Sequence, residues 1–172
     1  MSTGEHAYNE TYTGDHLNRI AFPLGGIGAG MMCLEGSGAL SHVSLRHRPD
    51  VFNEPRQFAA LHVGGDTPTT RVLEGPVPMW KAFGQPGAGN GSGATSYGLP
   101  RFRQAAFTAR FPFATISLRD PSTFVEVELT GWSPVVPGPA APPSLPTRAP
   151  EYTLNNPAAH PLPVSARRHI SL

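Results

Sequence analysis

Four glycines within six residues are the first feature of this chain that could carry chemistry. They stand at positions 25, 26, 28 and 30 of the run AFPLGGIGAG, residues 21–30. Glycine-rich turns can hold phosphates, but the dinucleotide pattern counted from Gly26 needs a glycine where Met31 stands, and the P-loop pattern counted from Gly25 needs a lysine there. The strand–helix–strand context of a nucleotide site is missing as well. We therefore expect these glycines to allow positive φ or close backbone approach where a strand begins.

Glu126 and Glu128 are the only closely paired carboxylates on a predicted strand. Side chains two residues apart on a strand project from the same face, about 6 to 7 Å apart. That separation overlaps the one needed by the acid and base of glycoside hydrolysis. Alternating glutamates on a strand are more typical of its solvated face, and this is the interpretation we adopt.

Histidines offer no metal or triad pattern. His42, Arg46, His47 and Arg48 lack the helical i, i+4 spacing and the carboxylate partner of a zinc site, which favours surface or interface histidines. Serine, histidine and aspartate do not occur together in a recognisable context such as a nucleophile elbow. We therefore predict no catalytic residue, no metal site and no cofactor in this chain.

Trp80 and Trp132 are the two aromatic side chains large enough to stack on a sugar. Trp132 adjoins a predicted strand and precedes a proline turn, which indicates a structural role. Trp80 lies in PVPMWKAFG, which we predict to be a loop, and it is the better candidate for a ligand-binding or interdomain contact.

Composition narrows the possible partners. The net charge of +1 provides no field that would attract nucleic acid or an anionic membrane. A single cysteine, Cys33, excludes an intrachain disulfide and a cysteine-based zinc finger. No apolar run has the length of a transmembrane segment, and the first residues lack the apolar core of a signal peptide. We expect a cytoplasmic protein.

The elements that must position these residues are strands, because the hydrophobic pattern has a period of two. Residues 114–118 and 125–129 alternate in this way around the turn Arg119-Asp120-Pro121-Ser122, which predicts an antiparallel hairpin. Similar patterns predict hairpins from 27–34 with 40–45 and from 58–63 with 70–74, and a further strand at 151–154.

The fold class that follows is an all-β antiparallel sandwich with little helix, since no segment of ten residues shows a helical stripe with caps. Two stretches are predicted to be loops or disorder. They are residues 85–96, rich in Gly, Ala and Ser, and residues 134–150, rich in proline.

Five phrases in this order resemble the N-terminal domain of the family 116 glycoside hydrolases, which include non-lysosomal glucosylceramidase, or bile-acid β-glucosidase. The resemblance runs from about residue 12 to about residue 164. The phrases are IAFPLGGIGAG, the hairpin FAALHV with RVLEG, LPRFRQAAFTARFPFATISLRDP, GWSPVVPG and EYTLNNP.

The resemblance implies a mainly antiparallel β-sandwich that precedes a larger helical (α/α)6 catalytic domain. It also implies that the glutamate nucleophile and the aspartate acid/base lie in that second domain, so no residue of this chain inherits either role. A β-glucoside would be hydrolysed only through that partner domain, with this chain as a scaffold. An alternative of a different class is a free-standing carbohydrate-binding or protein-interaction module, with Trp80 as its anchor.

The end of the chain departs from the family pattern, because ARRHISL follows where further sandwich strands are expected. A truncated or frameshifted reading frame would explain this. We therefore expect a disordered N-terminus at 1–11, a partial sandwich at 12–164 and a divergent C-terminal tail at 165–172. Uncovered strand edges would leave the isolated chain marginally stable or prone to aggregation.

Overall fold

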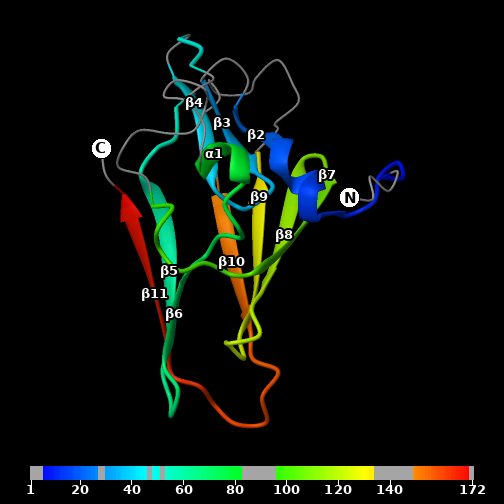
Figure 1. Ribbon diagram of the computed structural model, residues 1–172. Coiled ribbons are helices and arrows are strands. Elements are labelled where there is room, and N and C mark those ends of the chain that lie inside the picture. The colour runs from blue at the N-terminus through cyan, green and yellow to red at the C-terminus, as the bar shows by residue number, and fades with distance from the viewer. Residues whose placement is uncertain are drawn as a thin grey trace, which may run out of the picture.

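A computed structural model describes residues 6–26, 30–45, 48–50, 53–82, 96–133 and 149–170. Its elements follow one another along the chain as strands with two short helices (Figure 1). They are β1 (Tyr12–Thr13), the 3-10 helix η1 (Gly14–Arg19), β2 (Ala21–Gly26), β3 (Gly30–Glu35), β4 (Leu40–Leu45), β5 (Gln57–Val63), β6 (Thr69–Val72), α1 (Met79–Ala82), β7 (Gln104–Arg110), β8 (Phe113–Arg119), β9 (Glu126–Trp132), β10 (Ala149–Asn155) and β11 (Val164–Ile170).

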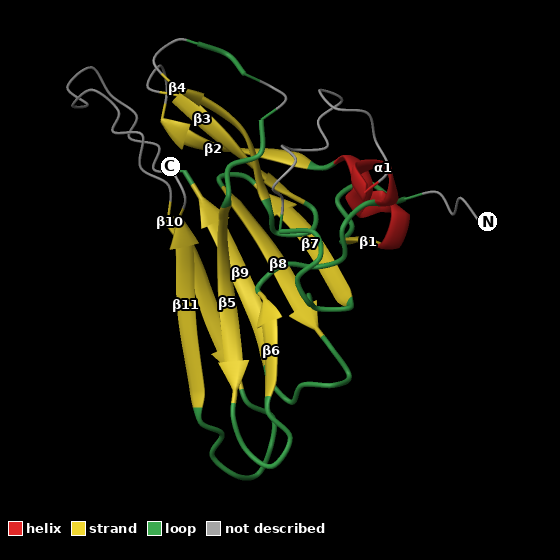
Figure 2. Ribbon diagram, turned by 60° about the vertical axis from the view of Figure 1, so that its left-hand side comes forward, coloured by secondary structure: helices red, strands yellow, loops and turns green. Residues whose placement is uncertain are grey.

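The strands form three antiparallel sheets. One sheet has five strands in the order β1-β7-β8-β9-β10, and the other two have three strands each, β11-β5-β6 and β2-β3-β4. Figure 2 shows how the strands of the larger sheet run behind β11, β5 and β6, with β2, β3 and β4 at the upper end. The sequence prediction of an all-β antiparallel sandwich with little helix is confirmed by this arrangement.

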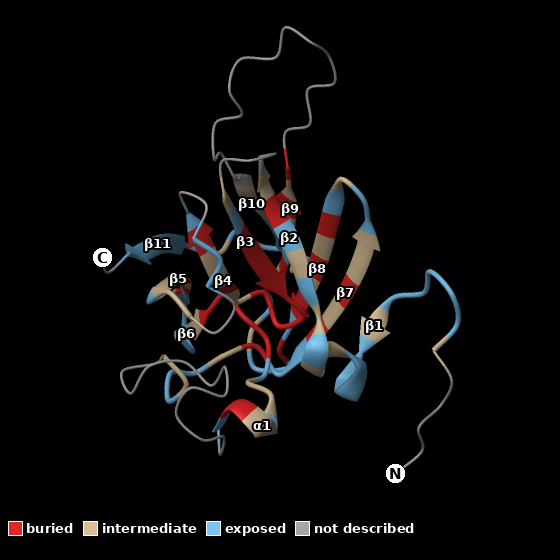
Figure 3. Ribbon diagram, turned by 90° about the horizontal axis from the view of Figure 1, so that it is seen from above, coloured by how far each residue is buried: buried red, intermediate tan, exposed pale blue. Residues whose placement is uncertain are grey.

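The core lies where the sheets face one another. Alternate residues are buried along β8 and β9, as expected for strands with one face in a core and one in solvent. Their buried side chains join those of the smaller sheets in a single hydrophobic cluster, which includes Leu34 of β3 and Leu61 of β5. Figure 3 shows buried positions in β3, which belongs to a three-stranded sheet, and in β9, which belongs to the five-stranded sheet.

The three predicted hairpins and the predicted strand are all present. β3 pairs with β4, β5 with β6 and β8 with β9, and β10 covers the strand expected at 151–154. The loops predicted at 85–96 and 134–150 lie outside the described residues, except for Ser96 and the first two residues of β10.

The structure describes parts of both terminal segments. β11 lies almost wholly in the segment expected to be a divergent tail, yet each of its residues pairs with one of β5. Arg167 and Arg168 interrupt the alternation of apolar residues by which a strand is recognised in a sequence. The segment is a strand because it pairs with β5. Near the N-terminus, the Arg110 guanidinium donates a hydrogen bond to the Asn9 side chain at 2.6 Å. Asn9 belongs to the region 1–11 expected to be disordered, and residues 1–5 of that region lie outside the described structure.

The described part of the glycine run lies in the paired strands β2 and β3, where Gly26 pairs with Gly30, and Gly28 lies outside the described residues. Gly25 has φ +145° and Gly30 has φ +126°, so positive φ, one of the two expected reasons for these glycines, is present at both. A Cβ on Gly25 would lie 2.5 Å from the Gly30 carbonyl oxygen, and a Cβ on Gly30 would lie 2.5 Å from that of Ser44. The Gly25 amide also donates to Ser133 Oγ at 3.0 Å, which joins the hairpin to the end of β9.

The two helices of the described residues are both too short to span a membrane.

Replacing Gly25 by alanine should destabilise the fold by about 1–3 kcal/mol, because it adds backbone strain at positive φ and a contact with the Gly30 carbonyl. Urea denaturation followed by circular dichroism measures the change. Gly98→Ala is the matched control, since a Cβ there meets open space. Equal destabilisation by the two substitutions would contradict this account of the hairpin.

Candidate functional site: a buried ion network beside an open pocket

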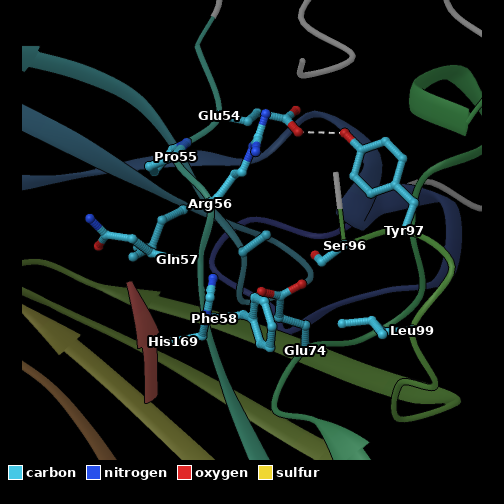
Figure 4. Close-up of a pocket in the computed structure, with 12 residues that line it drawn as sticks. Glu54, Pro55, Arg56, Gln57, Phe58, Glu74, Ser96, Tyr97, Leu99 and His169 are labelled. Atoms are coloured by element: carbon cyan, nitrogen blue, oxygen red, sulfur yellow. Dashed lines mark hydrogen bonds between the residues drawn. The ribbon is translucent and has the colours of Figure 1, made fainter. Parts of the chain in front are cut away.

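A buried lysine joins two glutamates from distant parts of the chain. Lys81 of α1 is 5% exposed, and its Nζ lies 2.6 and 2.7 Å from Oε1 and Oε2 of Glu35, the last residue of β3. The same ammonium donates to Oε1 of Glu54, just before β5. The Tyr97 hydroxyl donates to Oε2 of Glu54, the bond drawn as a dashed line in Figure 4. One cation and one phenol thus orient two carboxylates.

A second buried pair lies next to this network. Arg101 donates from Nη2 and Nε to Oε2 of Glu74 at 3.2 and 3.3 Å. Its Nη1 donates to the Ser96 carbonyl at 2.7 Å, and Nη2 donates to Ser96 Oγ at 2.7 Å. Because guanidinium hydrogen bonds are directional, the pair fixes the segment 96–101 against the end of β6.

An open pocket of about 340 Å³ adjoins both groups (Figure 4). Glu54, Glu74 and Tyr97 line it, as does Arg56, which is exposed. Phe58 lies in the wall and stacks on His169 of β11, with ring centroids 5.0 Å apart. The volume falls within the usual range for small-molecule sites.

Burial raises the pKa values of three groups in or beside the ion network. Burial raises the pKa of the Glu74 carboxyl, and nearby Glu35 adds to that effect, while the Arg101 guanidinium opposes it. The pKa of Tyr97 is raised strongly by burial and by its bond to Glu54, so its hydroxyl keeps the proton that it donates. Burial also raises the pKa of the Cys33 thiol, with a further contribution from Glu35. These shifts all disfavour additional negative charge.

Each carboxylate of the network is an acceptor for a buried cation. The carboxylates of Glu35 and Glu54 both accept hydrogen bonds from the same ammonium, and Glu74 accepts two from a guanidinium. Lys81 Nζ is held as a donor between carboxylates, which leaves no activated nucleophile. Among the described residues, no group of three potential ligands is arranged to hold a metal ion.

Trp80 lies on α1, so the prediction that it stands in a loop is wrong. Its indole Nε1 donates to the Asn18 carbonyl at 2.9 Å, and the Arg19 guanidinium carbon lies 5.0 Å from the ring centroid. The indole also lines a pocket of about 230 Å³ together with Glu35 and Lys81 of the network. These contacts hold the segment 76–82 against η1, and a role for Trp80 in ligand binding stays a prediction.

The other sequence candidates lie away from this network. Glu128 is exposed on β9, and Glu126 forms an exposed ion pair with Arg119, Oε1 to Nε 3.0 Å. The solvated-face interpretation of the two glutamates is therefore confirmed. Trp132 ends β9, where it is paired with Phe113 of β8.

His42 lies on β4 with φ +54°, and its Nδ1 is buried without a hydrogen-bond partner among the described residues. Arg46 and His47 of the same sequence cluster lie outside the described residues, and Arg48 forms an isolated bridge with Leu45.

Sequence reasoning missed every charged member of the network. Lys81 meets Glu35 across 46 positions and Glu54 across 27, so no local spacing could announce the contacts. The only hint in the sequence is that Lys81 directly follows Trp80, which is the candidate for a ligand-binding or interdomain contact.

A family model described as beta-glucosidase 2, glycosyl-hydrolase family 116 N-term, matches residues 21–167. The match covers most of the chain, so the chain belongs to this family of glycosyl-hydrolase N-terminal domains. A comparison with curated proteins gives no match.

Replacing Lys81 by methionine should cost about 3–5 kcal/mol, because it leaves two buried carboxylates without their ammonium. Thermal and urea unfolding measure the loss. Arg119→Met is the matched control, since its pair with Glu126 is exposed and such pairs contribute under about 1 kcal/mol. If the two substitutions cost the same, Lys81 does not hold the network together.

The Glu74 pKa makes a second prediction, for the pH dependence of stability. A carboxyl whose pKa is higher in the folded state than in the unfolded state binds its proton more tightly when the protein is folded. It therefore stabilises the fold at pH values below the ordinary pKa of 4.5, and this contribution is lost as pH rises through the folded-state pKa. The unfolding free energy of the parent chain minus that of Glu74→Gln should therefore fall as pH rises above about 4.5. Urea titrations from acid to neutral pH measure it, with Glu128→Gln as the control on the exposed face of β9. A difference that increases with pH would contradict the assigned direction.

Proposed function

We propose that this chain is the non-catalytic N-terminal β-sandwich of a β-glucosidase or glucosylceramidase-type glycoside hydrolase. In this proposal it scaffolds a helical (α/α)6 catalytic domain in the cytoplasm, and a β-glucoside is hydrolysed only through that domain. The observation that carries the proposal is the family match over residues 21–167, because the matched unit is described as the N-terminal part of an enzyme.

The carboxylates support a scaffold without chemistry of its own. Those of Glu35, Glu54 and Glu74 are each engaged by a buried cation, as hydrogen-bond acceptors. The remaining close pair, Glu126 and Glu128, lies on the solvated side of β9, and neither residue lines one of the described pockets. A retaining or inverting pair needs one carboxyl free to protonate the leaving group and another free to attack or activate water.

A surface suited to a partner domain lies beside α1. The segment 76–79, η1 and the start of β7 enclose a groove of about 850 Å³. Met79 at its border is 70% exposed, and Leu17 and Val77 add apolar surface. Arg103 is exposed in the same groove. We assign this groove to the catalytic domain, whose contacting element should be apolar with an acidic residue facing Arg103.

The proposal predicts association without turnover. The purified chain should not hydrolyse an aryl β-glucoside, and it should bind the catalytic region of a family 116 β-glucosidase that lacks its own N-terminal domain. Because Met79→Glu places a charge on the apolar border, it should weaken that binding about tenfold or more, as measured by biolayer interferometry.

Phe124→Glu provides the matched control, since Phe124 is an exposed aromatic residue outside the groove. Turnover by the chain alone that disappears in Glu35→Gln would overturn the non-catalytic role. A chain that binds sugars but not the catalytic region would instead favour the free-standing module.

A further inference from the structure

The pocket in Figure 4 is lined by two carboxylates on opposite sides, Glu54 and Glu74, and by the guanidinium of Arg56. Glu54 and Tyr97 lie on one side of it, and Phe58 and Glu74 lie on the other. Its volume of about 340 Å³ opens to solvent and is not filled by described residues. The donors, acceptors and apolar surfaces that line a pocket indicate the chemical class of ligand that it can bind.

The acceptors of the pocket are held in place before any ligand arrives. Lys81 and Tyr97 fix the two oxygens of Glu54, and Arg101 fixes Glu74. A carboxylate oxygen has lone pairs for two hydrogen bonds, so each Glu54 oxygen retains the capacity to accept one more. Ligand hydroxyl groups that donate to these oxygens would therefore meet an ordered partner, which lowers the entropic cost of binding.

Donors and an apolar wall complete the set. Arg56 is exposed, lines the pocket, and forms no ion pair with the described residues, so its guanidinium can donate to a ligand oxygen. The Phe58 ring, backed by His169, adds a flat apolar surface on which C–H groups pack well.

The charges select against ionic ligands. An anion would face the carboxylates of Glu54 and Glu74, and a cation would face Arg56, while Lys81 and Arg101 already balance the buried carboxylates next to them. A neutral ligand with several hydroxyl groups meets both kinds of partner favourably, since a hydroxyl donates to a carboxylate and accepts from a guanidinium.

We propose that this pocket binds a neutral monosaccharide unit, with its hydroxyl groups on Glu54, Glu74 and Arg56 and one of its C–H faces on Phe58. The inference goes beyond the proposed scaffold role, because it gives the sandwich a sugar site of its own that binds without hydrolysing. The proposed site does not include Trp80, which lines a different pocket.

Ligand-observed NMR and isothermal titration calorimetry of the full chain test the inference with D-glucose, D-galactose, D-mannose and methyl β-D-glucoside. At least one of these should bind saturably. Arg56→Met should weaken that binding about tenfold, because it removes a charge-assisted hydrogen bond worth about 1.5 kcal/mol. Tyr97→Phe should weaken it as well, because Glu54 loses the donor that orients one of its oxygens.

A matched variant keeps the test decisive. Arg103→Met, in the groove beside α1, should leave sugar affinity unchanged, because Arg103 does not line this pocket. Circular dichroism checks that every variant is folded. Failure of all four sugars to bind would overturn the inference, as would binding that folded Arg56→Met and Tyr97→Phe leave intact. Tenfold tighter binding of D-glucosamine or D-glucuronate than of D-glucose would overturn it too, by showing an ionic site. None of these results bears on association with the catalytic region, which tests the scaffold role separately.

Discussion

The buried ammonium of Lys81 is the contact on which the arrangement around the pocket depends. A lysine is rarely taken out of water unless carboxylates compensate for its lost hydration, and here Glu35 and Glu54 both do so. The three residues come from α1, from the end of β3 and from the approach to β5. Their association therefore holds the segment 76–82 over the junction of two sheets that share no direct strand pairing.

The same association organises what lies on either side of it. Toward one side it orients Glu54, which in turn accepts from Tyr97 and forms part of the 340 Å³ pocket. Toward the other it holds Trp80 beside η1, so that the segment 76–79 becomes one border of the larger groove. A single ionic centre thus supports both the surface that we assign to a partner domain and the pocket that we assign to a sugar.

Carboxylates in a domain of a glycosyl-hydrolase family can be structural ion-pair partners as well as catalytic groups. Hydrolysis needs carboxyl groups that are free to exchange protons or attack, whereas the buried glutamates here are bound by Lys81 and Arg101. The raised pKa of Glu74 arises from burial in a structural pair, and perturbed pKa values of this kind accompany ion networks as well as active sites. Function therefore has to be argued from contacts, since family membership and residue type leave both uses open.

The sequence by itself determined the class of fold and most of the hairpins. Alternating residues such as Val127 and Leu129 mark strands because one face of each strand meets the core, and turn residues mark where strands reverse. The spacing of the glycine run also argued against a phosphate loop. The positive φ of Gly25 and Gly30, in contrast, is known only from the structure.

Only the tertiary structure decided the identity of the candidate site. Lys81, Glu35 and Glu54 are ordinary polar residues in the sequence, and they become a buried network only when sheet packing brings their elements together. β11 is a strand for a related reason, because β5 supplies its partners while its own arginines break the apolar alternation. The local pattern of apolar residues indicates which face of a strand is buried. Contacts between distant segments depend on how the strands are arranged in the sheets, and this arrangement produces no periodic pattern in the residues that come into contact.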